Sequence, residues 1–156
     1  MITHLDTQGN PTMVNVTEKA VTCRTAIARS IVFLPDEVLR LLMDDEIHTK
    51  KGSVFQIAII AGIMAAKKTG ELIPLCHPLG LDNCSVIIQL NEKHEVVIDC
   101  TATITAKTGV EMEALVGASI AALTVYDMCK AISHDIVIKE TKLIEKTGGK
   151  RDFKRA

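Results

Sequence analysis

The pattern of hydrophobic and polar positions divides the chain into predicted helices, strands and polar connections. Apolar or periodic stretches predict helices over 35–47, 53–68 and 110–133. Runs rich in β-branched residues predict strands over 13–16, 24–33, 85–90, 96–105 and 136–144. A helix fits residues 24–33 nearly as well as a strand, and the polar segment NEKHE predicts a turn before the strand at 96–105.

Start signals support two of these helices. Pro35 is followed by acidic residues in the first predicted turn, and Val38 and Leu41 continue at helical spacing. Ser53 lies where an N-cap side chain is expected for the second helix.

The order of strand, helices, hairpin, helix and strand predicts an α+β fold. It is the ferredoxin-like arrangement, an antiparallel sheet with helices packed on one face. The chain has 156 residues, enough for one domain. We expect residues 1–156 to form a single domain, with 1–12 as a flexible arm and 147–156 as a mobile basic tail. Many unrelated functions share this fold, so function must come from particular residues.

Both long helices carry small residues three or four positions apart, a spacing that lets helix backbones approach closely. These residues are Ala58, Ala61, Gly62, Ala65 and Ala66, then Ala114, Gly117, Ala118, Ala121 and Ala122. Two interpretations are open at this point. The helices either pack against each other within one chain or form an interface between subunits.

Composition and charge narrow the classes of function. Apolar residues make up 47% of the chain and charged residues 24%, which is typical of a globular protein. The net charge is -1, from 18 basic and 19 acidic residues, which argues against a nucleic-acid-binding domain. With one Tyr, three Phe and no Trp, the chain offers few platforms for stacked bases. We therefore expect no nucleic-acid partner.

Cysteines and apolar stretches bear on where the protein works. The five cysteines lack a C-x-x-C pair and the spacing of a zinc site, so we expect reduced thiols and no metal. The start MITHLDTQGN has no secretory-signal pattern. The apolar stretch 53–66 is shorter than the ~20 residues that cross a bilayer. We expect a cytoplasmic protein with no membrane segment.

The segment LIPLCHPL, residues 72–79, is the first candidate for chemistry. Pro74 fixes its own backbone angle and Pro78 favours extended geometry at His77, so Cys76 and His77 lie on a stiffened loop. Active-site residues often lie on such loops. On these residues alone, a structural turn in which His77 bonds a carbonyl is the stronger alternative. Adjacent extended residues point in opposite directions, which argues against a Cys–His catalytic pair.

Charged residues on the predicted helix over 110–133 form a second group. Glu111 and Glu113 follow Gly109, and the helix dipole alone accounts for acidic residues there. Being two apart, they lie about 200° apart around a helix, so one pocket should receive at most one of them unless the helix start is irregular. Asp127 and Lys130 are three apart and share a face. They are either an exposed ion pair or a partly buried functional pair, and their apolar neighbours favour burial.

Lysines recur at the ends of predicted elements. They are Lys51, Lys67, Lys146 and Lys150. The segment KTGGK at 146–150 lacks P-loop spacing, although glycine amides beside lysines suit an oxyanion such as phosphate. Taken singly, each lysine is explained by solvation. The residues by themselves therefore indicate an intracellular α+β protein with a candidate site for a phosphorylated small molecule.

Three segments together resemble the cyclic pyranopterin monophosphate synthase family, also called the molybdenum cofactor biosynthesis protein C family. They are LIPLCHPL, KTGVEMEAL and TVYDMCKA, and with the later GGK the likeness covers roughly residues 13–150. The resemblance implies a lyase that converts a cyclised dihydroguanosine triphosphate to cyclic pyranopterin monophosphate and releases pyrophosphate. It also implies no cofactor, a small nucleotide-derived substrate, and a homohexamer built as a trimer of dimers.

The resemblance assigns roles by position. Asp127 matches the family's catalytic aspartate, and Lys130 matches its partner lysine. The positions implied to contact substrate are Leu75, Cys76, His77, Met112, Glu113, Glu111, Lys51, Lys67 and Lys146. The chain departs from the family at Ser53, at Lys68 and in its final RDFKRA. The alternatives are a regulatory small-molecule-binding module of the same fold and, more distantly, an RNA-binding module.

Helix length predicts how such a site is assembled. Glu113 and Asp127 are 14 residues apart, so on one unbroken helix they lie about 21 Å apart along its axis. A nucleotide-sized pocket cannot gather both from one chain. Two chains packed antiparallel along the small-residue helix faces would bring Asp127 near the partner subunit's Glu113 and the partner subunit's His77. We therefore expect sites shared between subunits.

Overall fold

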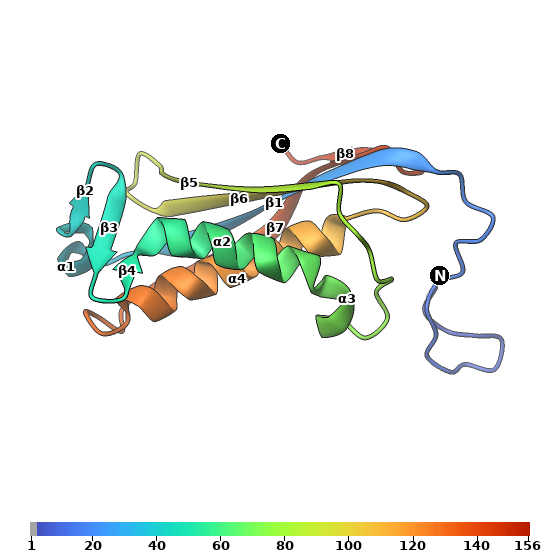
Figure 1. The fold of residues 1–156 in the computed structure, drawn as a ribbon, viewed down its shortest axis with the longest axis horizontal. Coiled ribbons are helices and arrows are strands. Elements are labelled where there is room, and N and C mark those ends of the chain that lie inside the picture. Colours follow the sequence, from blue (N-terminus) through green and yellow to red (C-terminus); the bar gives the residue numbers. More distant parts are fainter. Residues whose placement is uncertain (1–2) are drawn as a thin grey trace.

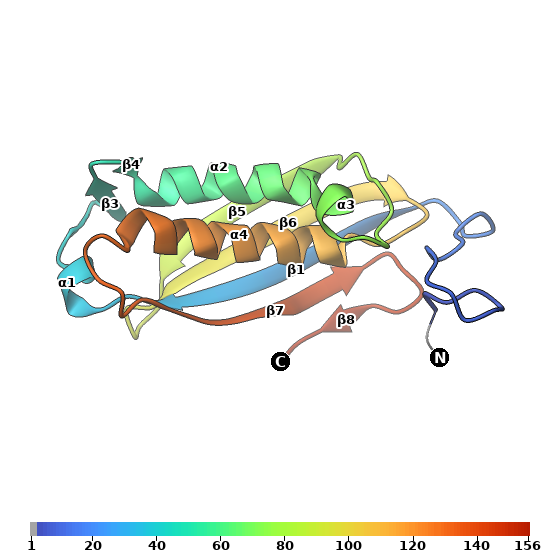
Figure 2. The same cartoon turned by 90° about the horizontal axis from the view of Figure 1, so that it is seen from below.

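The computed structural model describes residues 3–156 and is built on a five-stranded antiparallel sheet (Figure 1). In spatial order its strands are β5 (Asn83–Leu90), β6 (Val96–Ala106), β1 (Thr22–Phe33), β7 (Val137–Thr147) and β8 (Phe153–Lys154). Two long helices, α2 (Val54–Lys67) and α4 (Glu111–Cys129), cover one face (Figure 2). The strand order β7-β1-β6-β5 with these crossovers is ferredoxin-like, so the predicted α+β fold is confirmed.

Strand β1 is the centre of the sheet, between β6 and β7. Every second residue from Ala26 to Val32 is buried, the period expected of a strand with one covered face. This period settles the choice between strand and helix for residues 24–33. The one polar member of the buried row, Ser30, is 2.6 Å from the hydroxyl of Thr141, so its polar atom is satisfied.

Helices α2 and α4 run in opposite directions and touch backbone to backbone (Figure 2). A Cβ at Gly62 would lie 2.9 Å from the carbonyl oxygen of Gly117, and one at Gly117 would lie 2.5 Å from the Cys100 sulfur. Apart from the half-buried Ala61, the small residues of both helices are buried within this chain. Packing within the chain is therefore the correct interpretation. A subunit contact along these small-residue faces, as expected from sequence, is wrong because the faces are already occupied.

The predicted helix over 35–47 is wrong beyond its first turn. Helix α1 covers only Asp36–Leu39. A small sheet of three short strands follows it: β2 (Leu42–Met43), β3 (Glu46–Thr49) and β4 (Gly52–Ser53). Asp44 and Asp45 have φ angles of 51° and 59°, the left-handed pair that closes a tight hairpin. The predicted strand over 13–16 is also wrong, because these residues have no strand partner among those described.

The start of α2 is capped by a side chain from β3. The Glu46 carboxylate accepts hydrogen bonds from the backbone N–H groups of Phe55 at 2.8 Å and Gln56 at 3.1 Å. These are N–H groups that a helix leaves unpaired. Ser53 occupies the N-cap position but makes no capping bond, and its hydroxyl instead lies 3.3 Å from His48 Nδ1. The predicted N-cap position, residue 53, is therefore correct. The predicted capping group is wrong, because Glu46 and not Ser53 accepts the hydrogen bonds.

Both ends of the chain fold back locally. Within 147–156, β8 pairs with the end of β7, and Arg155 Nε donates to the Leu143 carbonyl at 2.8 Å. Gly148 has a φ of 85°, and a side chain there would collide with the Cys23 carbonyl group. In the N-terminal arm, the Asp6 carboxylate accepts the backbone N–H groups of Gln8 and Asn10, each at 2.8 Å.

Among the helices of residues 3–156, α4 alone has the length and apolar composition of a membrane-crossing helix. Half of that apolar window is buried inside the fold. Core helices of globular proteins have the same properties, so the length and composition of α4 are explained by its packing on the sheet.

We predict that Gly62→Ala destabilises the protein, because the new methyl group meets the Gly117 carbonyl, Ala121 and Val86 within 3.1 Å. Overpacking costs about 1–3 kcal/mol, and the better helix propensity of Ala offsets about 1 kcal/mol of it. The expected net loss is up to about 2 kcal/mol in the free energy of unfolding, measured by urea denaturation. The matched control is Gly80→Ala, which meets nothing within 4 Å. A Gly62→Ala protein as stable as this control would contradict the tight helix contact.

Candidate active site

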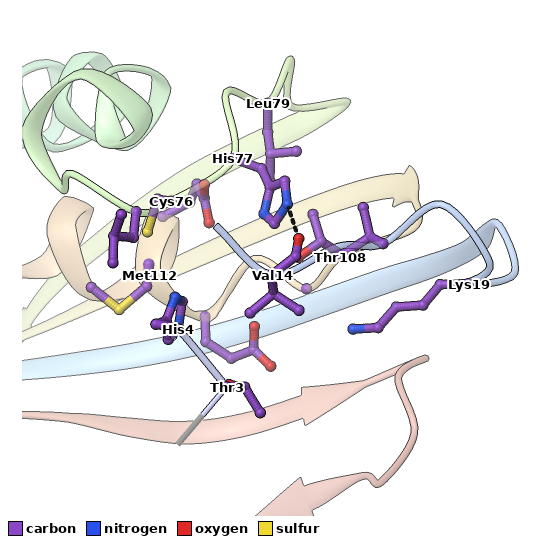
Figure 3. Close-up of a pocket in the computed structure, with 14 residues that line it drawn as sticks. Thr3, His4, Val14, Lys19, Cys76, His77, Leu79, Thr108 and Met112 are labelled. Atoms are coloured by element: carbon purple, nitrogen blue, oxygen red, sulfur yellow. Dashed lines mark hydrogen bonds between the residues drawn. The ribbon is translucent and has the colours of Figure 1, made fainter. Parts of the chain in front are cut away.

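A cavity of about 310 Å³ opens at the N-terminal end of α4 (Figure 3). Six of the residues expected to contact substrate line it: Leu75, Cys76, His77, Glu111, Met112 and Glu113. The N-terminal arm closes another side with Thr3, His4, Val14 and Val16. The structure therefore brings the LIPLCHPL loop and the start of α4 together, and it adds arm residues that the sequence gave no reason to choose.

The loop that carries Cys76 and His77 is held by a turn and by close packing. Pro74 is the second residue of a turn closed by the Cys76 N–H on the Ile73 carbonyl, at 3.2 Å. The loop also rests on the short helix α3 (Thr69–Leu72), because a Cβ at Gly70 would lie 3.0 Å from the Pro78 Cα. These contacts fix the position of the loop, so that Cys76 and His77 line the cavity.

His77 bonds a carbonyl and lines the cavity at once. Its Nε2 lies 2.8 Å from the carbonyl oxygen of Val14, as drawn in Figure 3. A carbonyl only accepts, so Nε2 carries the proton and Nδ1 of the neutral ring is an acceptor. The structural role expected of His77 is therefore present, and it leaves one ring nitrogen that can accept a proton.

Glu113 lies in the first turn of α4 and is buried, with only 4% of its surface exposed. Burial raises the pKa of this carboxyl above its ordinary value, and the neighbouring Glu111 charge raises it further. Its backbone hydrogen bond and the nearby His77 oppose the rise. Burial and the Glu113 charge also raise the pKa of the Cys76 thiol. Glu113 therefore holds a proton more readily than an exposed glutamate does, while Cys76 is not activated as a nucleophile.

Glu111 reaches the same cavity because Gly109 makes room for it. Its carboxylate occupies the space where a Cβ at position 109 would stand. It pairs there with Lys146 Nζ at 3.0 Å. Both Glu111 and Glu113 line the cavity, which sequence allowed only for an irregular helix start. Glu111 is the first helical residue, and its side chain folds back over the glycine.

A basic groove of about 230 Å³ adjoins the cavity and shares Lys19, Thr108, Gly109 and Glu111 with it. Four cationic side chains line the groove against the single carboxylate of Glu111: Lys19, Arg24, Lys146 and Lys150. Sequence reasoning missed Lys19 and Arg24. Neither lies beside a glycine or in a motif. Arg24 is on β1, whose pairing with β7 brings it to the KTGGK segment, and Lys19 lies in the turn just before β1.

Asp127 and Lys130 lie at the opposite end of α4, together with Lys51. Asp127 Oδ1 is 2.8 Å from Lys130 Nζ, and its Oδ2 is 3.3 Å from Lys51 Nζ. The hydrogen bonds from Lys130 and then Lys51 lower the pKa of Asp127, and Asp127 raises the pKa of Lys130. The side chains of Asp127 and Lys130 are 53% and 50% exposed, so the burial favoured by their apolar neighbours is not found in the single chain.

One unbroken helix separates the two groups. Helix α4 runs from Glu111 to Cys129 without interruption, so Asp127 lies about 21 Å along the axis from Glu113. Lys67 is the last residue of α2, where its charge acts on Cys84, and it does not line the cavity. Of the eleven residues expected in the site, seven line the cavity or the groove and three lie together at the far end of α4. The eleventh, Lys67, lies at the C-terminal end of α2 and belongs to neither group.

Comparison with known proteins gives one consistent result. The model of the MoaC family matches residues 13–149. A cyclic pyranopterin monophosphate synthase of Xanthomonas campestris pv. campestris is 53% identical over 152 residues, covering 97% of this chain and 92% of the relative. Two longer relatives match over part of their length. A molybdenum cofactor biosynthesis bifunctional protein of Synechocystis sp. is 51% identical over 97% of this chain and 45% of its own. Molybdenum cofactor biosynthesis protein 1 of Dictyostelium discoideum is 48% identical over 94% of this chain and 26% of its own.

We predict that Glu113→Gln stabilises the protein at neutral pH. Because the folded chain raises the pKa of Glu113 above 4.5, the ionised carboxylate opposes folding once the pH exceeds that value. Below 4.5 the carboxyl is protonated in both folded and unfolded chains, so the advantage of the variant should vanish. Wild type should lose stability relative to Glu113→Gln as the pH rises through the folded-state pKa.

The measurement is urea unfolding of both proteins from acidic to neutral pH, at matched protein concentration. Glu92→Gln, an exposed position in the turn after β5, is the control and should show little of this pH dependence. A Glu113→Gln protein that is less stable than wild type at neutral pH would show that burial is not the dominant influence on this carboxyl.

Proposed function

The chain belongs to the MoaC family, and we infer that it is a lyase of molybdenum cofactor biosynthesis with cyclic pyranopterin monophosphate synthase activity. The observation that carries this inference is the meeting of LIPLCHPL and GVEMEAL around one cavity beside a basic groove. Relatives about 52% identical over 97% of the chain are named for the same activity. A non-catalytic regulatory module is therefore not favoured.

The basic groove suits the phosphates of a nucleotide-derived substrate. We propose that Lys146, with Lys19, Arg24 and Lys150, binds a triphosphate there, and that the adjoining cavity receives the rest of the cyclised nucleotide. Cationic side chains at this position would stabilise the charge that develops as pyrophosphate leaves. The shared rim of groove and cavity would let one ligand occupy both.

Ring opening and reclosure require protons to be moved, and the two ends of α4 differ in how they hold protons. At the cavity end, Glu113 has a raised pKa and His77 has an acceptor nitrogen. At the far end, Asp127 has a lowered pKa and holds Lys130 as an ammonium group. General acids and bases of both kinds are thus available. We propose that Asp127 orients Lys130 and that Lys130 exchanges protons with the substrate.

A single chain separates these groups, so we propose that the site is completed by a second subunit. The small-residue faces of α2 and α4 are occupied within the chain, and the contact must use another surface. The outer sides of the two helices expose Ile60, Met64 and Leu123, each about half exposed. Leu123 precedes Asp127 by one helical turn, so a subunit covering this face would also cover the ion pair.

The family resemblance suggests the finer assembly, a homohexamer built as a trimer of dimers. We propose cytoplasmic residence as well, because all five cysteines are free thiols. Both statements rest on likeness and chemistry, and neither is needed for the catalytic proposal.

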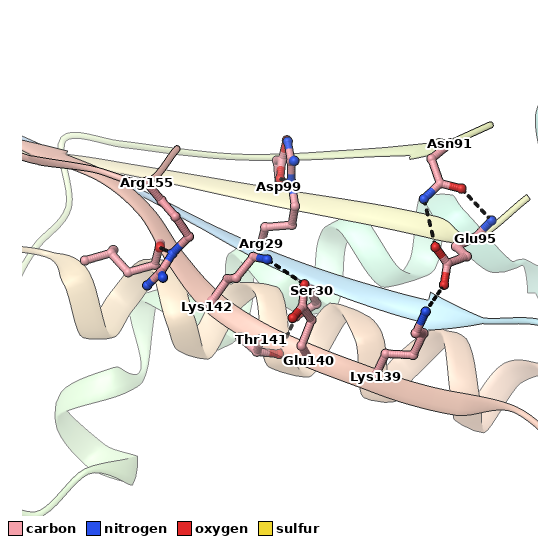
Figure 4. A network of polar contacts seen from close by, with 11 residues as sticks. Arg29, Ser30, Asn91, Glu95, Asp99, Lys139, Glu140, Thr141, Lys142 and Arg155 are labelled. Atoms are coloured by element: carbon pink, nitrogen blue, oxygen red, sulfur yellow. Dashed lines mark hydrogen bonds and ion pairs between the residues drawn. The ribbon is translucent and has the colours of Figure 1, made fainter. Parts of the chain in front are cut away.

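We predict that Lys130→Ala and Asp127→Ala each lower kcat by about 10²–10⁴-fold, the usual contribution of a general acid or base, with an unchanged fold. Pyrophosphate release followed by phosphorus NMR gives the rate, and circular dichroism reports the fold. Lys142→Ala is the matched control, since Lys142 also forms an ion pair, at 2.7 Å with Glu140 on β7 (Figure 4), and lines neither the cavity nor the groove. Near-normal kcat in either α4 variant would overturn the catalytic assignment.

We predict that mixing two inactive variants, Asp127→Ala and His77→Ala, restores part of the activity. In a mixed dimer with shared sites, one site takes its Asp127 and its His77 from the undamaged ends of the two chains. The control mixture is Asp127→Ala with Lys130→Ala, whose lesions lie at the same end of α4 and leave every mixed site damaged. Subunit exchange is verified by native mass spectrometry. Exchange without restored activity would show that each site lies within one chain.

A further inference from the structure

Two cysteines face each other beneath the helices and have no part in the proposed chemistry. Cys84 of β5 and Cys100 of β6 have their sulfur atoms 3.8 Å apart. Cys100 is fully buried, and its sulfur fills the space where Gly117 has no side chain. Cys84 is half-buried and feels the positive charge of Lys67. One cysteine is therefore partly exposed, and the other is fully buried beside it.

The two thiols are chemically unequal. The hydrogen bond with Cys100, and the Lys67 charge, lower the pKa of Cys84, while the same hydrogen bond and burial raise the pKa of Cys100. Burial raises the pKa of Cys76, and it raises that of Cys129 to about 11. A lowered pKa, partial exposure and a neighbouring second thiol are the features of redox-sensitive cysteines.

We propose that Cys84 and Cys100 form a redox-active dithiol, which peroxide closes to a disulfide and which in its closed form lowers turnover reversibly. The loss of turnover rests on the proposed function, whereas formation of the bond does not.

The reaction balances with hydrogen peroxide as oxidant. The Cys84 thiolate attacks one peroxide oxygen and the O–O bond breaks. Hydroxide is the leaving group, and Cys84 becomes a sulfenic acid. Cys100 then attacks the Cys84 sulfur, the S–S bond forms, and the sulfenic oxygen leaves as hydroxide. The thiol protons convert both hydroxides to water. In sum, two thiols and one peroxide give one disulfide and two waters.

The strand register makes closure depend on movement. Cys84 pairs with Ala102 and Cys100 pairs with Val86, so the two cysteines are diagonal neighbours on the same face. Diagonal Cα atoms lie about 7–8 Å apart, beyond the ~4.4–6.8 Å that a disulfide spans. β5 is an edge strand that pairs only with β6 in the described sheet, so closure has one ladder of hydrogen bonds to distort and not two, and we expect β5 to be the strand that moves. A bond formed under such strain is easily reduced, as expected of a reversible switch.

A shift of β5 reaches the cavity through the chain itself. The loop bearing Leu75, Cys76 and His77 leads directly into β5. Asp82 ties their junction to β6, accepting the Thr105 N–H at 2.7 Å. Because a misplacement of about 1 Å can cost about a hundredfold in rate, sliding β5 should lower turnover by moving His77.

The test treats the full-length protein with hydrogen peroxide and maps its peptides by mass spectrometry without reduction. We expect the Cys84 and Cys100 peptides to be linked, with the loss of two hydrogen atoms, and dithiothreitol to separate them. Cys84→Ser and Cys100→Ala should lose the link, and Cys23→Ser, an exposed cysteine away from the pair, should keep it. Should Cys100→Ala fail to fold, wild type and Cys84→Ser decide the question. A link to another cysteine, or irreversible oxidation of Cys84 alone, would overturn the dithiol.

Turnover is measured on the same samples. Wild type should lose about tenfold to a hundredfold of its rate on oxidation and recover it with dithiothreitol. Cys84→Ser retains Cys76 in the cavity and should lose much less, so direct oxidation of Cys76 is distinguished. An oxidised, disulfide-linked wild type with an unchanged rate would overturn the regulatory part. If the reduced protein shows no turnover, the proposed function is refuted. The dithiol proposal is still tested in that case, because detection of the disulfide by mass does not depend on turnover.

Discussion

The close contact of α2 with α4 at Gly62 and Gly117 is the constraint on which the rest of the structure depends. A side chain on either residue would enter the opposite backbone or the Cys100 sulfur, so the helices meet at a distance that only glycine allows. At that distance both helices pack on the same sheet face, and most of their small residues are buried within the chain. The outer helix faces are left to carry larger apolar side chains and the Asp127 ion pair.

That packing also keeps α4 straight and continuous, which gives the two ends of the helix separate chemical characters. Its first turn presents Glu113, with a raised pKa, to a cavity closed by the LIPLCHPL loop. Its last turn presents Asp127, with a lowered pKa, between two lysines at the surface. A helix start and a helix end can serve one small ligand only when two chains are combined, so the geometry of the core bears directly on assembly.

The sequence predicted those parts of the structure in which local pattern and global packing agree. The bounds of β1, α2 and α4 were predicted within a few residues, although a helix fitted residues 24–33 nearly as well until the period-two burial of β1 was seen. It failed where a distant group overrides the local signal. Two left-handed aspartates turn the predicted helix after α1 into a hairpin, and Glu46 replaces Ser53 as the cap of α2. The motif residues of the cavity could be named from sequence, whereas Lys19 and Arg24 reach the groove only through the pairing of β1 with β7 and the turn before β1.

The distribution of charge gives a physical reason for the arrangement. Isolated surface ion pairs contribute little to stability, so the two lysines on Asp127 and the four cations around Glu111 are not explained as stabilising contacts. In both places positive charge exceeds negative charge, within a chain whose net charge is -1. The rest of the chain therefore carries a net negative charge. A field of this form attracts a polyanionic ligand to the two ends of α4 and disfavours its binding elsewhere. In the shared site proposed above, the same excess would oppose the burial of both ends in a subunit contact unless a polyanion is bound between them. The ligand would then be part of the charge balance of that proposed site.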